Sequence, residues 1–152
     1  MVEVQPPAGT GEVALYARVS GSDQREDLER QLGRLAAFAA SEGFAVTQTV
    51  SEVGSALNGA RPRLRRLLAN PRIGVIVCEH RDRLTRFGFG YLQAALAAQS
   101  RHIIVMNDAE IADDLVRDMT EVLTSFCARL YGKNSAARRA QAALRCAQRS
   151  EA

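Results

Sequence analysis

The chain has 152 residues, of which 47% are hydrophobic and 24% charged, and its formal net charge at pH 7 is +3. This length and composition are typical of one water-soluble domain that can bury a core, and no apolar run approaches the ~20 residues needed to span a bilayer. Residues 1–11 contain two prolines and no basic residue, so we expect a flexible lead-in and not a secretory signal. The three cysteines, Cys78, Cys127 and Cys146, form no Cys-x-x-Cys pair. They argue against a disulfide framework or a zinc site and favour the reducing cytoplasm.

The first predicted element is a strand over residues 13–20, a short apolar run bounded by glycines and typical of a strand buried on both faces. Residues 24–41 predict a helix because leucine and alanine recur at helical spacing. Residues 44–50 predict a second strand nearer a sheet edge. Ser20 stands at the carboxyl end of the first strand, and Arg18 precedes it by two positions on the same side. This pair could be a nucleophile with its anion-binding partner; alternatively, Ser20 caps the helix and Arg18 forms a surface ion pair.

The middle of the chain continues the alternation of strands and helices. Residues 52–60 predict a mobile loop that is not a P-loop, because no Gly-Lys-Ser/Thr follows it. A short helix is expected over residues 62–70, and the very hydrophobic residues 73–78 predict a central parallel strand. A helix around residues 91–96 and a strand over residues 102–106 follow. The pattern predicts an α/β fold with a mostly parallel sheet of four to five strands flanked by helices.

The last third departs from this rhythm. Residues 112–147 predict one long C-terminal helix, in which only Gly132 could be a break. Its apolar residues follow a three-four spacing, typical of a helix that packs lengthwise on another helix. We expect this seam to form an oligomer interface through Val116, Met119, Leu123, Phe126 and Leu130. The alternative is an ordinary amphipathic helix that lies on its own sheet.

Basic residues are clustered. The cluster in residues 132–150 consists of Lys133, Arg138, Arg139, Arg145 and Arg149. A second cluster consists of Arg61, Arg63, Arg65 and Arg66. A third consists of Arg81, Arg83 and Arg86. Such clusters favour polyanion binding, although they can also be solvated faces. For the last helix we expect contact with a phosphate backbone through Lys133, Arg138, Arg139 and Arg145.

Two charged segments follow predicted strands. Tyr16-Ala-Arg-Val-Ser20 ends the first strand, and Asp82-Arg-Leu-Thr-Arg86 follows the central one. If these strands are neighbours, their ends place Ser20 among arginines, with Asp82 able to hold a guanidinium. This pairing resembles the catalytic domain of serine site-specific recombinases, the resolvase/invertase family, over most of the chain. The segments His80-Arg-Asp-Arg-Leu and Ala128-Arg-Leu-Tyr-Gly132 most resemble the small serine transposases of insertion sequences.

The resemblance implies a resolvase-like catalytic domain over residues 12–152. Its activity would be cleavage and rejoining of DNA strands through a covalent 5′-phosphoserine intermediate, with no cofactor and no metal. Its partners would be double-stranded DNA and further copies of the chain, as homodimers that form tetramers on synapsis, in the cytoplasm and without a membrane. The implied site consists of the nucleophile Ser20, the phosphate-binding Arg18, Arg83, Arg86 and Arg61, and the positioning residues Gln31, Glu52 and Asp82.

Three other readings stay open. His80 could act as a general base, although the sequence suggests no carboxylate that would orient it. Four aspartates, Asp82, Asp108, Asp113 and Asp114, could form a metal site of a phosphatase or nuclease; Asp113 and Asp114 are more simply explained by the positive end of the last helix. The chain could also be a catalytically silent DNA-bridging or oligomerisation module of the same fold.

Overall fold

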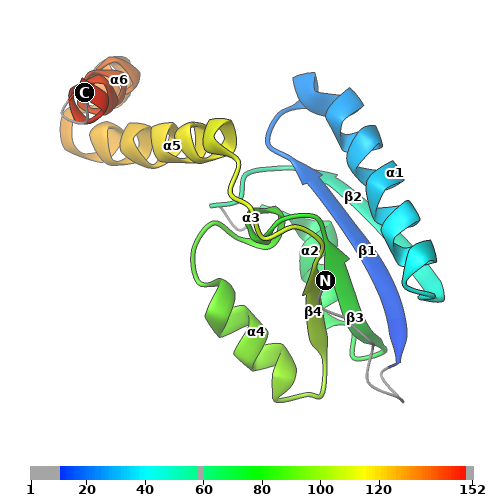
Figure 1. Cartoon of the computed structure of the whole chain (residues 1–152). Helices are drawn as coiled ribbons and strands as arrows, with labels where there is room; N and C mark the ends of the chain where they lie inside the picture. Colours follow the sequence, from blue (N-terminus) through cyan, green and yellow to red (C-terminus); the bar gives the residue numbers. More distant parts are fainter. Residues whose placement is uncertain (1–10, 58–59, 150–152) are drawn as a thin grey trace. The chain divides into compact units, whose positions relative to one another are not determined.

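The computed structural model describes residues 11–57 and 60–149, with the backbone alone at residues 133 and 134 (Figure 1). Nearly all of the expected lead-in, residues 1–11, lies outside the described residues. The chain divides into two compact units, residues 1–109 and residues 110–152. Among the described residues, no helix is both long enough and apolar enough to cross a membrane.

The first unit contains a parallel sheet, as predicted. Its four described strands are β1 (Glu12–Val19), β2 (Val46–Val53), β3 (Ile73–Cys78) and β4 (His102–Val105). Their order is β2-β1-β3-β4, and all three pairings are parallel. The predicted edge position of the second strand and the central position of β3 are confirmed. β1 and β3 are neighbours, so their carboxyl ends lie at the same edge of the sheet.

Helices cover both faces of this sheet (Figure 1). A 3-10 turn, η1 (Ser22–Gln24), leads into α1 (Arg25–Ser41), which packs on one face. The other face is covered by α2 (Pro62–Ala69), α3 (Arg81–Leu84) and α4 (Phe89–Ala97). The four-residue α3 was not predicted from the sequence, because its segment is dominated by charged side chains.

Strand β1 passes between these two layers. Val13, Leu15 and Ala17 pack toward α1, whereas Ala14 and Tyr16 pack toward α2 and α4. Side chains alternate along a strand, so residue 18 belongs to the α2 side. This alternation directs an arginine into the layer that α3 and the start of α2 occupy.

The second unit corrects one prediction. The single helix expected over residues 112–147 is two helices, α5 (Ala112–Tyr131) and α6 (Lys133–Arg149), which contact each other. The chain turns at Gly132, where φ is +84°, a value that side-chain-bearing residues rarely adopt. A glycine inside a helix costs only about 1 kcal/mol relative to alanine. Its presence alone therefore did not decide between a continuous and a broken helix.

Candidate active site

Arg18 is the centre of a buried network at the carboxyl end of β1. Its guanidinium donates from Nε to the Arg83 carbonyl at 3.0 Å, from Nη2 to the Asp82 carbonyl at 2.6 Å and from Nη1 to the Gly54 carbonyl at 2.8 Å. Nη1 also donates to the Ser20 Oγ at 3.1 Å. Only 1% of Arg18 is exposed. One side chain thus connects β1, the loop after β2 and helix α3, and the predicted proximity of Arg18 to Ser20 is confirmed.

Ser20 follows β1 and is half-buried. Its backbone N–H and that of Gly21 both donate to the Gln24 Oε1 at 3.2 Å, which fixes the turn after the strand. The other predicted residue near this turn is Gln31 on α1. Its Oε1 accepts from the Arg18 N–H at 2.9 Å, and its Nε2 donates to the Arg18 carbonyl at 3.2 Å. Gln31 therefore binds the backbone of the strand end to α1 and holds Ser20 and Arg18 in register.

Glu52 orders the start of α2. Its carboxylate accepts from the Arg63 N–H at 2.9 Å and the Leu64 N–H at 3.2 Å, two donors of the first helical turn. It also accepts from the Tyr16 hydroxyl at 3.0 Å. Burial is the main cause that raises the pKa of Tyr16 above its ordinary value; the Arg61 guanidinium opposes the shift, and Glu52 adds to it. The Tyr16 hydroxyl therefore stays a donor to Glu52.

Replacing Glu52 by alanine is expected to lower the free energy of unfolding by roughly 2–4 kcal/mol. The change removes the acceptor of a helix N-terminus and leaves the buried Tyr16 hydroxyl without its partner. Urea denaturation followed by circular dichroism measures the loss. Glu52→Gln keeps an acceptor oxygen, and we expect it to cost about half as much. Equal stability of Glu52→Ala and the unmodified chain would contradict the capping role.

Arg61 lies immediately before α2 and is buried. Its Nη1 donates to the Arg83 carbonyl at 3.2 Å, the same oxygen that Arg18 contacts. Its Nε is buried and has no hydrogen-bond partner among the described residues. Gly54 makes room for this side chain, because an added Cβ there would lie 3.1 Å from the Arg61 Cγ. Arg18 and Arg61, which come from distant segments, thus meet beside the end of β1. The Arg61 Nε–H remains as a donor for a hydrogen bond to a phosphate oxygen.

Asp82 holds a guanidinium, as the sequence suggested. Its Oδ2 accepts from the Arg86 Nη2 at 3.0 Å, and both side chains are largely buried. Arg83 is also buried, and its carbonyl receives Arg18 and Arg61. The structure therefore brings Ser20, Arg18, Arg61, Asp82 and the backbone of Arg83 together, with Arg86 fixed by Asp82. The catalytic roles assigned to these residues stay predictions.

His80 differs from its prediction, because a carboxylate does face it. The Glu79 Oε1 lies 3.3 Å from its Nε2, and the Asn107 carbonyl lies 2.9 Å from its Nδ1. Glu79 is held in turn by Arg34 through two hydrogen bonds of 2.9 and 3.0 Å. Both ring nitrogens of His80 already face an acceptor oxygen. This geometry disfavours His80 as the base that takes the Ser20 proton.

Two other chemistries find little support at this edge of the sheet. Burial raises the pKa of the Cys78 thiol to about 12, so it is not a competing thiolate nucleophile at neutral pH. Among the described residues, no group of three or more His, Cys, Asp or Glu side chains is placed to hold a metal ion. Asp82 is paired with Arg86, and Asp108 is paired with Arg81 at 2.6 Å. The four aspartates considered from the sequence thus form no ligand set.

The remaining predicted residues lie in the second unit. On α5, Val116, Phe126 and Leu130 are 43%, 58% and 72% exposed, whereas Met119 and Leu123 are partly buried. On α6, Arg138, Arg139 and Arg145 are exposed, and the Lys133 side chain lies outside the described residues. The Arg139 guanidinium lies 4.0 Å from the centre of the Tyr131 ring. The expected apolar seam therefore presents three large side chains to solvent in this chain.

Sequence reasoning missed several residues that build the site. Gln24 was not singled out, because a glutamine four positions after a serine carries no distinctive signal. The bidentate pair of Arg34 and Glu79 joins residues 45 positions apart and could not be found without the sheet order. The Gly54 carbonyl was missed because backbone acceptors have no sequence signature. These groups hold the strand ends without being chemically reactive.

Comparison with known families matches residues 13–149 to the family described as "Resolvase, N terminal domain". The uncharacterized protein Rv2886c of Mycobacterium tuberculosis is 46% identical over 154 residues, which cover 99% of this chain and 52% of that protein. The putative resolvase R771 of Acanthamoeba polyphaga mimivirus is 28% identical over 124 residues, 77% of this chain and 63% of that protein. The chain thus spans about half to two thirds of the length of these curated relatives.

Solved structures resemble the chain over most of its length. The C-terminal catalytic domain of IS1535 TnpA, an IS607-like serine recombinase, has 55% sequence identity and a TM-score of 0.79, and the match covers 89% of this chain and 98% of that domain. A serine recombinase from Sulfolobus solfataricus has 32% identity and a TM-score of 0.76, with 91% of this chain and 97% of that one covered. The parallel sheet and its flanking helices are therefore those of serine recombinase catalytic domains.

Proposed function

The chain belongs to the resolvase family, and from that premise we propose that it is the catalytic domain of a serine transposase. It cleaves and rejoins DNA strands through a covalent 5′-phosphoserine intermediate. The observation that carries the proposal is the hydrogen bond from the buried Arg18 guanidinium to the Ser20 hydroxyl at the end of β1. A hydroxyl at a strand end, held by a buried arginine that also contacts the backbone of Asp82 and Arg83, suits attack on a phosphodiester.

In the proposed reaction, the Ser20 oxygen attacks a DNA phosphorus in line. A bond forms between Oγ and phosphorus while the bond to the 3′-oxygen breaks, and the 3′-hydroxyl leaves with a proton. The serine hydroxyl loses its own proton in the same step. Because the phosphodiester energy is kept in the Ser20–phosphate bond, rejoining is the reverse attack by a 3′-hydroxyl and requires no nucleotide cofactor.

Arginines stabilise the transition state in this scheme. Negative charge develops on the nonbridging phosphate oxygens, and guanidinium forks bind such oxygens through paired hydrogen bonds. We assign this binding to Arg83, Arg86 and Arg61, with Arg18 holding the attacking oxygen. The buried Nε of Arg61 supports its assignment, because this donor finds no acceptor among the described residues. Such preorganised donors are each worth about 10²–10³ in rate.

Trapping the covalent intermediate tests the function. A set of duplexes is nicked a few nucleotides on the 5′ side of the cleavage point, so that the fragment carrying the leaving 3′-hydroxyl dissociates and rejoining fails. The expected result is a denaturant-stable protein–DNA adduct whose modified peptide contains Ser20, formed equally well in EDTA. An adduct on another residue, cleavage that stops on chelation, or DNA binding without any adduct would contradict the proposal; the last outcome would indicate a silent DNA-bridging module.

The second unit supplies the proposed partner contacts. The exposed basic residues of α6, among them Arg138 and Arg145, are assigned to the DNA backbone. The exposed apolar side chains of α5 are assigned to association with further copies of the chain, as dimers and, on synapsis, tetramers. Removing three large apolar side chains from water favours such association by the hydrophobic effect.

Replacing Phe126 by glutamate is expected to weaken self-association at least about tenfold. A charge placed in a buried apolar contact is costly, and Phe126 is 58% exposed in the single chain. Sedimentation velocity over a concentration series measures the effect. Ser125→Glu is the matched control, since it adds the same charge to the neighbouring exposed position, outside the seam. Identical sedimentation of the two variants would count against the α5 interface.

A further inference from the structure

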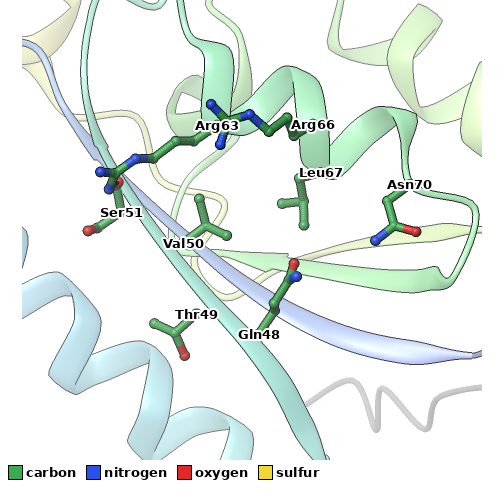
Figure 2. A pocket seen from close by; sticks show the side chains of 8 residues that line it. All are labelled: Gln48, Thr49, Val50, Ser51, Arg63, Arg66, Leu67 and Asn70. Carbon is green, nitrogen blue, oxygen red and sulfur yellow. Dashed lines mark hydrogen bonds between the residues drawn. The ribbon is translucent and has the colours of Figure 1, made fainter.

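A groove separates the edge strand β2 from helix α2. Its volume is about 520 Å³. Eight described residues line it: Gln48, Thr49, Val50, Ser51, Arg63, Arg66, Leu67 and Asn70 (Figure 2). None of these eight is acidic, and two are arginines. We call this feature the β2–α2 groove.

The charge of this groove is not neutralised from within. Glu52 is the carboxylate that contacts the start of α2, but it is buried and already accepts from Tyr16, Arg63 and Leu64. A second groove lies between α1, β2 and the start of α2 and shares Ser51 and Arg63 with the first. Its volume is about 670 Å³, and its lining includes Glu29 and Glu52. The two grooves flank the same strand, yet only the β2–α2 groove has a lining that is basic without acids. A polyanion is therefore favoured there.

The two arginines offer donors in a defined arrangement. The Arg63 Nη1 donates to the Ser51 carbonyl at 2.8 Å, and Figure 2 shows this side chain reaching from α2 toward β2. A guanidinium has five N–H donors, so this bond orients Arg63 and leaves donors for a ligand. Arg66 is exposed and lies three positions further along the helix, about 5–6 Å away between Cβ atoms. Two fork-shaped donors at this spacing suit consecutive phosphates of one strand.

We propose that the β2–α2 groove binds the phosphodiester backbone of DNA that flanks the cleaved phosphate. The choice of DNA as the occupant rests on the proposed function. It is supported by continuity with the site, because Arg61 lies immediately before α2 and this helix carries Arg63 and Arg66. The neutral side chains of Gln48 and Asn70 add hydrogen-bonding groups to the same hollow. Contacts of this kind position a duplex without reading its sequence.

Salt-dependent DNA binding tests the groove. Fluorescence anisotropy of a labelled duplex is measured with the unmodified chain and with Arg66→Gln over a range of salt concentrations. Loss of one phosphate contact is expected to raise Kd about 3- to 10-fold near 0.1 M salt and to lower the slope of log K against log salt by about 0.9. Arg63→Gln is expected to lower the slope by a similar amount.

Arg65→Gln is the matched control. Arg65 is exposed on the same helix but does not line the groove, so its replacement removes an equal charge. We expect its slope to stay near that of the unmodified chain. An equal effect of Arg65→Gln and Arg66→Gln would indicate diffuse attraction and overturn the proposal, as would an unchanged slope in Arg66→Gln.

Two further measurements separate the possible occupants and the two proposals. Calorimetric titration with inorganic phosphate asks whether the groove takes a free anion; Arg66-dependent phosphate binding with unchanged DNA binding would overturn the assignment to DNA. The covalent adduct assay is run on the same proteins. Absence of the Ser20 adduct in the unmodified chain would contradict the proposed function. The salt slopes would still show whether the β2–α2 groove binds DNA.

Discussion

Replacing Ser20 by alanine is expected to abolish adduct formation and to lower DNA cleavage at least about 10³-fold. The variant lacks the hydroxyl oxygen that receives a hydrogen bond from Arg18 at the end of β1, and loss of a covalent nucleophile cannot be offset by the remaining phosphate binding. Quantification of the covalent adduct on a denaturing gel, with the nicked duplex in excess, measures the effect.

The matched control for this change is Ser22→Ala. Ser22 is exposed in η1, two positions after the proposed nucleophile, and its replacement is expected to leave the adduct yield unchanged. Ser20→Ala should unfold at nearly the same urea concentration as the unmodified chain, because the Arg18 Nη1 retains the Gly54 carbonyl. Adduct formation that persists in Ser20→Ala would refute the assignment of the nucleophile.

The fold was largely predictable because its strands are short apolar runs with clear boundaries. The residues of β3 match the prediction, and the alternation of strands and helices correctly indicated a parallel sheet. Strand alternation also placed Arg18 and Ser20 on one side. The structure places β1 beside β3 in the sheet. This pairing explains how residues more than sixty positions apart share one site.

Features that depend on long-range polar contacts were not predictable. Glu52 was expected near the site, but its bonds to the first turn of α2 required the exact placement of that helix. The carboxylate beside His80 was missed even though Glu79 precedes it directly, since neighbouring residues on an extended backbone need not face each other. At Gly132, local propensity left both a continuous and a broken helix possible, and tertiary contact between α5 and α6 decided.

Replacing Arg18 by lysine is expected to lower the free energy of unfolding by roughly 2–4 kcal/mol and the cleavage rate of the folded protein by about 10²–10³-fold. Lysine keeps the charge, but one ammonium cannot reproduce a planar fork that reaches three carbonyls and a hydroxyl. The stability loss reflects buried carbonyls left without donors. The rate loss reflects a Ser20 hydroxyl that is no longer held for attack.

Arg101 provides a matched control for this variant within the same unit. It is also buried, and its guanidinium also donates to three carbonyls, those of Ile73, Leu67 and Leu68, near the start of β3. Arg101→Lys should therefore cost a similar free energy of unfolding, measured by urea denaturation, while adduct formation per folded molecule stays unchanged. If both variants lost activity only in proportion to their unfolded fraction, Arg18 would be a structural tie between β1 and α3 and not part of the reaction. A selective loss in Arg18→Lys would instead show that the bond from Arg18 to the Ser20 oxygen contributes to the chemistry.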